Sequence, residues 1–263
     1  MNVEEIRKKI KNNEPSIGSW LQLPSADVAE LMAKSGYDWL AVDMEHASFG
    51  PSVLPDIFRG IECGGCAPFA RLPEAGKVWI KAALESGAQG LIFPMIESAA
   101  QLAHAIDLST YPGQDFWREP GTTATAYRGV GFCRANDFGK NFDSYRMGRA
   151  KDIFLVAQIE HIGAVEQIDA ILSHKRLDAI LVGPYDLSGS MGITGQFDHP
   201  DFQAAMTRIA SACKKFGTVM GCHVVEPDPQ ALAKEISRGS RFIAYGIDSV
   251  FLWNAARCPK LTD

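Results

Sequence analysis

The feature that most constrains the fold is a repeated alternation of short apolar runs with segments of helical spacing. A buried parallel strand reads as a continuous apolar segment, and strands that alternate with helices indicate a parallel sheet. Eight such units in a chain of 263 residues predict an α/β protein with one domain, a (β/α)8 TIM barrel spanning 1–263. The expected strands are 16–21, the run ending at Asp43, 68–71, 90–93, 153–159, 179–182, 218–222 and 242–245. A doubly wound open sheet is the alternative, but no G-x-G-x-x-G follows the first strand.

One stretch, at about 111–151, interrupts the alternation. It is rich in Gly, Arg, Thr and aromatic residues and shows no clean periodicity. Long irregular segments within compact domains are usually functional or disordered. The aromatic side chains, among them Trp117 and Phe132, favour an ordered loop that packs on something.

Charge and hydropathy exclude several classes of protein. The net charge is −5 with no basic cluster, which argues against a nucleic-acid partner. No apolar run approaches the roughly 18 residues of a membrane span. The first fourteen residues are charged throughout and lack an apolar signal core, which predicts a cytoplasmic protein.

Polar side chains gather where the expected strands end. In a barrel these positions converge on one face from distant parts of the chain. They are Trp20, Asp43, Glu45, His46, Arg71, Glu160, Asp186 and His223. The set holds the groups needed to make and hold an enolate: two carboxylates for a metal ion, a base and a guanidinium.

Glu160 and Asp186 follow neighbouring strands, and two such carboxylates suit a hard divalent cation such as Mg2+ or Mn2+. His46 is the candidate base, with Asp43 close enough in sequence to orient its ring. Each residue also has a structural interpretation: Arg71 could pair with a neighbouring carboxylate, and the two acids could cap the helix or turn that follows. No lysine ends a strand, so a Schiff-base aldolase is disfavoured and a metal-dependent route is favoured.

Several motifs together resemble the HpcH/HpaI aldolases, which are class II pyruvate aldolases. The resemblance runs from about Ile17 to the final helix, in the same order and with similar spacing. The motifs are Ile17-Gly18-Ser19-Trp20, Gly36-Tyr37-Asp38-Trp39, Asp43-Met44-Glu45-His46, Arg71-Leu72-Pro73, Pro94-Met95, Arg128-Gly129-Val130-Gly131, Gln158-Ile159-Glu160 and Gly183-Pro184-Tyr185-Asp186-Leu187-Ser188.

The resemblance implies a carbon–carbon lyase that reversibly cleaves a 4-hydroxy-2-oxo acid, of the 2-keto-3-deoxy sugar acid type, to pyruvate and an aldehyde. It implies a homo-oligomer, a hexamer built as a trimer of dimers with the last helix exchanged. Glu160 and Asp186 would ligate Mg2+ or Mn2+, with Co2+ also possible. His46, oriented by Asp43, would act as the base, and Arg71 would hold the enolate oxygen. Backbone N–H groups near Tyr185 and Asp186 would bind the substrate carboxylate. Trp20 and Gln158 would line the pocket.

Three departures from the family pattern fall on the aldehyde side of the expected site. An insertion separates Pro112 from Arg128, Tyr185 stands where the family usually has alanine, and His223 replaces an aliphatic residue. We therefore expect a pyruvate-like donor with an acceptor different from the familiar diacids. Tyr185 and His223 would contact substrate hydroxyls or simply fill space.

Three rival interpretations remain open. A citrate- or malyl-CoA lyase-like enzyme shares the barrel and the two-carboxylate metal site, but the D-x-E-H strand end argues against it. A decarboxylase or enolate-trapping synthase could use the same scaffold. The third rival is a catalytically silent barrel that acts as a binding protein and takes up no metal. The Glu160 and Asp186 pair argues against this interpretation.

Overall fold

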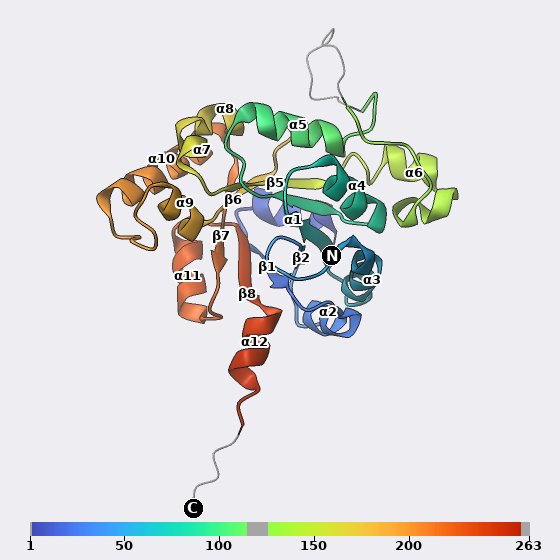
Figure 1. Cartoon of the computed structure of the whole chain (residues 1–263), viewed down its shortest axis with the longest axis horizontal. Coiled ribbons are helices and arrows are strands. Elements are labelled where there is room, and N and C mark those ends of the chain that lie inside the picture. The colour runs from blue at the N-terminus through green and yellow to red at the C-terminus, as the bar shows by residue number, and fades with distance from the viewer. Residues whose placement is uncertain (1, 115–125, 259–263) are drawn as a thin grey trace, which may run out of the picture.

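The computed structural model describes residues 2–114 and 126–258 and shows a closed barrel of eight parallel strands (Figure 1). Each strand pairs in parallel with its neighbours in sequence, and β8 closes onto β1. The strands are β1 (Ser16–Leu21), β2 (Trp39–Asp43), β3 (Ala67–Arg71), β4 (Gly90–Phe93), β5 (Phe154–Ile159), β6 (Ala179–Val182), β7 (Val219–Val224) and β8 (Phe242–Ile247). The predicted (β/α)8 barrel is confirmed; that the whole chain forms one domain stays a prediction.

Helices cover the outside of the barrel (Figure 1). They are α1 (Val3–Lys11), α2 (Ala26–Ala33), α3 (Leu54–Cys63), α4 (Lys77–Ser86), α5 (Ala99–Ser109), α6 (Phe142–Met147), α7 (Ile162–Glu166), α8 (Ile168–Leu172), α9 (Pro184–Ser190), α10 (Pro200–Phe216), α11 (Pro229–Ser237) and α12 (Asp248–Ala255), with the short 3-10 turns η1 (Pro51–Val53) and η2 (Arg134–Gly139). Helix α1 closes one end of the barrel, because Val3 and Ile6 join the buried cluster that fills the barrel interior. No described helix is long and apolar enough to cross a bilayer.

Aromatic rings fill the barrel interior. The indole of Trp39 stacks on Phe242 at 4.3 Å between ring centroids, and Phe69 and Phe154 pack beside them. Gly18 leaves room for this layer, since a Cβ there would overlap the indole of Trp39. The interior is therefore a packed core, which leaves the carboxyl ends of the strands as the place for an active site.

The largest differences from expectation lie in the connections. The described part of 111–151 contains η2 and α6, and Arg128 packs over Tyr111 at 4.3 Å while donating to the Tyr145 hydroxyl at 2.6 Å. This confirms an ordered segment at these residues. Residues 115–125, which hold most of the predicted insertion, and Trp117 with them, lie outside the described residues.

Two further elements differ from the expected pattern at strand ends. Helix α9 starts directly after β6 because Pro184 occupies its first turn, where a missing N–H costs nothing. Strand β7 continues to Val224, so His223 lies inside it rather than after it.

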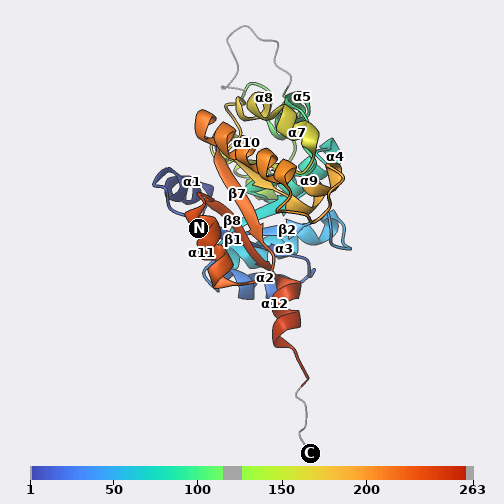
Figure 2. The same cartoon turned by 90° about the vertical axis from the view of Figure 1, so that its left-hand side faces the viewer.

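The final helix stands apart from the barrel. In both views α12 projects away from the body of the protein (Figures 1 and 2). Its Leu252 and Trp253 side chains are 56% and 79% exposed. Such an apolar surface on a protruding helix is typical of a contact with another chain.

Candidate active site

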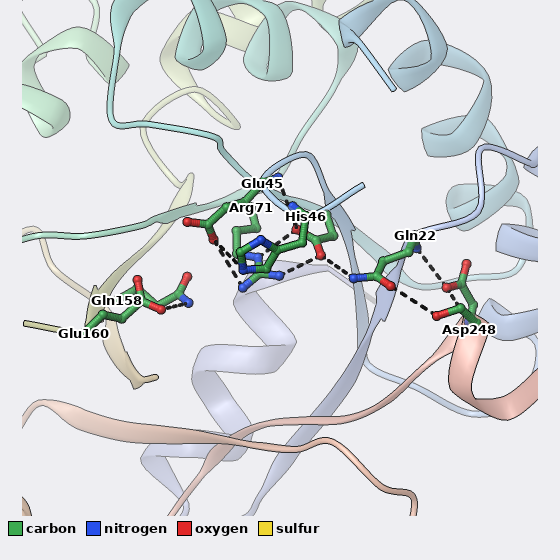
Figure 3. Close-up of polar contacts among 9 residues, drawn as sticks. Gln22, Glu45, His46, Arg71, Gln158, Glu160 and Asp248 are labelled. Carbon is green, nitrogen blue, oxygen red and sulfur yellow. Dashed lines mark hydrogen bonds and ion pairs between the residues drawn. The ribbon is translucent and has the colours of Figure 1, made fainter. Parts of the chain in front are cut away.

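A buried ion pair joins the ends of two neighbouring strands. The register of the sheet sets Asp43 at the end of β2 beside Arg71 at the end of β3. Arg71 Nε donates to Asp43 Oδ1 at 2.9 Å and Nη2 donates to Oδ2 at 2.6 Å, and Nη1 lies 3.3 Å from Glu45 Oε2. Burial would raise the pKa of Asp43, but the hydrogen bonds and charge of Arg71 hold it below its usual value. The guanidinium is thus fixed in one orientation at the rim of the barrel (Figure 3).

Arg71 also stacks on the ring of Trp20, which in turn contacts His223. Its guanidinium carbon lies 4.4 Å from the ring centroid of Trp20, and Trp20 packs edge-on against His223 at 5.7 Å. Burial and the positive charge of Arg71 lower the pKa of His223 to about 4, although a hydrogen bond to the Gly246 carbonyl opposes the shift. His223 is therefore neutral near pH 7, and its Nε2 is buried without a hydrogen-bond partner among the described residues.

Glu160 follows β5 and is 3% exposed. Its Oε1 accepts from Gln158 Nε2 at 2.6 Å, and its Oε2 accepts from the Met95 N–H at 3.1 Å. Met95 has a positive φ of 47°, a conformation that costs a non-glycine residue on the order of 1 kcal/mol. Gly183, between β6 and α9, lies so close to the carboxylate that a Cβ there would overlap it. The Glu160 carboxylate thus sits against the segment that carries Asp186.

Three carboxylates share this rim. Burial raises the pKa of Glu160 to about 7, the Met95 N–H opposes this, and the charges of Glu45 and Asp186 raise it further. The pKa of Glu45 is raised in the same way, by burial first and then by Asp43 and Asp186 against the effect of Arg71. Concentrated negative charge of this kind is relieved by a bound cation, so Glu160 and Asp186 fit a divalent ion chemically.

The cation would take only a few ligands from the protein. Within 2–114 and 126–258, no group of three or more His, Cys, Asp or Glu side chains is arranged to hold a metal. Mg2+ is commonly bound through one or two carboxylates, with water and substrate oxygens completing the shell. The Glu160 and Asp186 pair supplies two carboxylates of this kind, and that they bind a metal stays a prediction.

His46 lies beside this cluster, but not where the sequence placed its partner. Its side chain is 60% exposed, and its Nε2 is 3.9 Å from Glu45 Oε2 (Figure 3). Asp43 Oδ1 accepts from the backbone N–H groups of Glu45 and His46 at 3.2 Å each. The expectation that Asp43 holds the imidazole is corrected: Asp43 is occupied by Arg71 and fixes the backbone of the turn, and Glu45 is the carboxylate near the ring.

Tyr185 lies in the first turn of α9 and is 61% exposed. Its ring packs edge-on against Phe197, in the connection between α9 and α10, at 5.0 Å. The side chain therefore packs on this connection.

Sequence reasoning missed Gln22, the residue directly after β1. Its Nε2 donates to Asp43 Oδ2 at 2.8 Å (Figure 3). The signal was present, because the rule that selected Asp43 and Arg71 applies equally to the residue after the first strand.

The sequence profile of the HpcH/HpaI aldolase/citrate lyase family matches residues 16–255. The chain belongs to this family. The resemblance seen in the motifs is thereby confirmed, and this HpcH/HpaI protein is a carbon–carbon lyase of the aldolase type.

Relatives of this HpcH/HpaI aldolase match along almost the whole chain. The hydroxypyruvate/pyruvate aldolase of Paraburkholderia phytofirmans is 33% identical over 96% of this chain and 94% of its own length. The 2-keto-3-deoxy-L-rhamnonate aldolase of Salmonella gallinarum is 31% identical over 95% of this chain and 89% of its own. The crystal structure of a family protein from Burkholderia cenocepacia J2315 has a TM-score of 0.86 at 32% identity and covers 96% of both chains.

The low pKa of His223 makes acid stability a test of the site. The unfolded chain binds a proton at His223 near pH 6.5, whereas the folded protein does so only near pH 4. The contribution to stability is therefore complete above about pH 6.5 and is lost as the pH falls toward 4, by at most about 3 kcal/mol. Chemical denaturation from pH 7 to 4 should show this slope in the wild type and a smaller one in His223→Gln.

The matched control is His104→Gln, which alters an exposed histidine on α5. It should keep the wild-type slope. A His223→Gln variant whose stability falls with acid as steeply as the wild type would contradict a histidine that the fold keeps neutral.

Proposed function

We propose that this aldolase reversibly cleaves a 4-hydroxy-2-oxo acid of the 2-keto-3-deoxy sugar acid type to pyruvate and an aldehyde. The observation that carries the proposal is the Arg71 guanidinium, fixed by Asp43 beside a cluster of carboxylates that includes Glu160. A cation site next to a fixed guanidinium suits a substrate that acquires negative charge on an oxygen during the reaction. The printed activities of the relatives, a hydroxypyruvate/pyruvate aldolase and a 2-keto-3-deoxy-L-rhamnonate aldolase, point the same way.

Glu160 and Asp186 would hold the divalent ion, Mg2+ or Mn2+ by preference and Co2+ as a further possibility. When bound, the ion supplies Lewis-acid polarisation of the 2-oxo group, which makes the adjacent C–H more acidic. Gln158 keeps Glu160 in place through its 2.6 Å hydrogen bond. Both acids follow neighbouring strands, so the ion would lie at the carboxyl end of β5 and β6.

Arg71 would stabilise the enolate oxygen. A guanidinium carries five N–H donors, of which two bind Asp43 and one faces Glu45. Donors therefore remain for an oxygen that becomes negatively charged, and they need no reorganisation because Asp43 already fixes the group. Removing a donor of this kind costs roughly 100- to 1000-fold in rate.

His46 would move the proton between the pyruvate methyl group and solvent, through a water molecule. Its exposed ring and the nearby Glu45 carboxylate suit a group that must exchange protons with water. The first-turn N–H groups of α9, at Tyr185 and Asp186, have no carbonyl four residues earlier in the helix and would bind the substrate carboxylate. Trp20 would form the pocket wall beneath Arg71.

Exchange of the pyruvate methyl protons with deuterated buffer tests these roles without any aldehyde. We expect Arg71→Ala and His46→Ala each to lose at least about 100-fold in exchange rate, because one loses the oxyanion donor and the other the base. NMR of the methyl signal gives the rate, and His199→Ala, a histidine at the start of α10, is the control. Exchange at the wild-type rate in both site variants would refute the assignment.

We further propose that His223 contacts a hydroxyl group of the aldehyde. Its Nε2 is buried and unpartnered among the described residues, and the neutral ring presents an acceptor there. A hydroxyl donor on the substrate would satisfy it, which favours hydroxylated aldehydes over the familiar diacid-derived ones. Tyr185 would border the same side through its packing on Phe197.

The aldehyde preference of His223→Leu tests this contact. We expect kcat/KM for a hydroxylated aldehyde such as glyceraldehyde to fall about tenfold relative to propanal, since roughly 1–2 kcal/mol of hydrogen bonding is lost. Coupled assays of aldol addition with pyruvate give the ratio. If His223→Leu leaves the ratio unchanged, the histidine only fills space.

We also infer a homo-oligomer, a hexamer arranged as a trimer of dimers, in the cytoplasm. The protruding α12, with Leu252 and Trp253 exposed, supports a contact between subunits. Light scattering on the purified protein measures the assembly directly.

A further inference from the structure

Gln22 connects the start of α12 to the ion pair in the active site. Its side-chain Nε2 donates to Asp43 Oδ2 at 2.8 Å, and its Oε1 accepts from the Ser249 hydroxyl at 3.1 Å. Asp43 in turn holds both Nε and Nη2 of Arg71. An unbroken series of hydrogen bonds therefore runs from α12 to the guanidinium (Figure 3).

The far end of this series is itself held firmly. Asp248, the first residue of α12, is 3% exposed. Its two carboxylate oxygens accept from the backbone N–H groups of Gln22 and Leu23 at 2.8 and 2.9 Å, and Oδ1 also accepts from Ser249 at 2.7 Å. Both the backbone and the side chain of Gln22 are thus hydrogen-bonded to α12.

The amide is suited to this position because it must donate on one side and accept on the other. Asp43 is an ionised carboxylate that only accepts, and the Ser249 hydroxyl supplies the donor at the opposite end. Gln22 also takes up the second lone-pair site of Asp43 Oδ2 beside Arg71 Nη2. The carboxylate is therefore fixed from both sides.

We propose that Gln22 is a positioning residue, which sets the Asp43 carboxylate and through it the Arg71 guanidinium according to the placement of α12. The proposal rests on the proposed aldolase function, in which Arg71 stabilises the enolate oxygen. Gln22 would thereby make the rate of enolate formation depend on the position of α12, which lies outside the barrel.

Pyruvate proton exchange in Gln22 variants tests the proposal. Gln22→Met keeps the length of the side chain but loses both hydrogen bonds, and we expect kcat to fall about tenfold while the KM for pyruvate changes by less than twofold. A loss in kcat alone marks an effect on the transition state. Gln230→Met, an exposed glutamine in the first turn of α11, is the matched control and should behave as wild type.

The pH dependence of the rate in Gln22→Glu distinguishes a positioning role from a purely structural one. Its ionised carboxylate repels Asp43, whereas the protonated form can donate an O–H to Asp43 Oδ2. The ratio of variant to wild-type rate should therefore rise as the pH is lowered through the pKa of the new carboxyl group. In Gln22→Met the same ratio should stay constant with pH.

The experiments distinguish a failure of the role proposed for Gln22 from a failure of the proposed aldolase function. A wild-type enzyme that exchanges no pyruvate protons refutes the proposed aldolase function. The role of Gln22 is then tested by melting temperatures. Gln22→Met and Arg71→Met should shift the melting temperature non-additively when combined, because both act on Asp43. Additive shifts, a wild-type kcat in Gln22→Met, or a pH-independent rate ratio in Gln22→Glu would each overturn the proposal.

Discussion

The pairing of Asp43 with Arg71 is the interaction on which the rest of the site depends. Both side chains lose most of their contact with water, and a buried ion pair repays that cost only when its geometry is good and the remaining polar atoms are satisfied. Here the pairing is bidentate, and Gln22 and two backbone N–H groups complete the shell of the carboxylate. Parallel strands place the two residues side by side, so the barrel itself supplies the geometry.

This pair also divides the rim electrostatically. On one side burial, aided by the positive charge of Arg71, keeps His223 neutral, and its Nε2 has no hydrogen-bond partner among the described residues. On the other side burial, together with the negative charges of Glu45 and Asp186, raises the pKa of Glu160 to about 7. The result is one face suited to a cation and an anionic oxygen, and another suited to neutral hydroxyl groups. An aldolase needs both, since its donor is charged and its acceptor need not be.

Much of this could be read from the sequence because barrel geometry turns strand ends into neighbours. The apolar runs that end at Asp43, Arg71 and Glu160 were sufficient to predict the barrel and to collect its polar rim. Sequence could not choose the partner of Asp43, since His46 is near it along the chain whereas Arg71 is near it only across the sheet. Helix α9 was missed because Pro184 suits a turn as well as a helix start. The position of α12 is tied to Gln22 and Leu23 by the hydrogen bonds of Asp248 and Ser249, and no local sequence pattern predicts contacts between residues so far apart in the chain.

The central claim is that Glu160 and Asp186 together bind the divalent ion on which the reaction depends. Calorimetric titration of metal-free enzyme with Mn2+ tests it most directly, with Asp201→Asn, an exposed acid in the first turn of α10, as the control. The account predicts one site per chain in the wild type and in the control, and at least about tenfold weaker binding in Glu160→Gln and in Asp186→Asn. Undiminished Mn2+ affinity in both site variants, or full aldolase activity after the ion is removed, would contradict it.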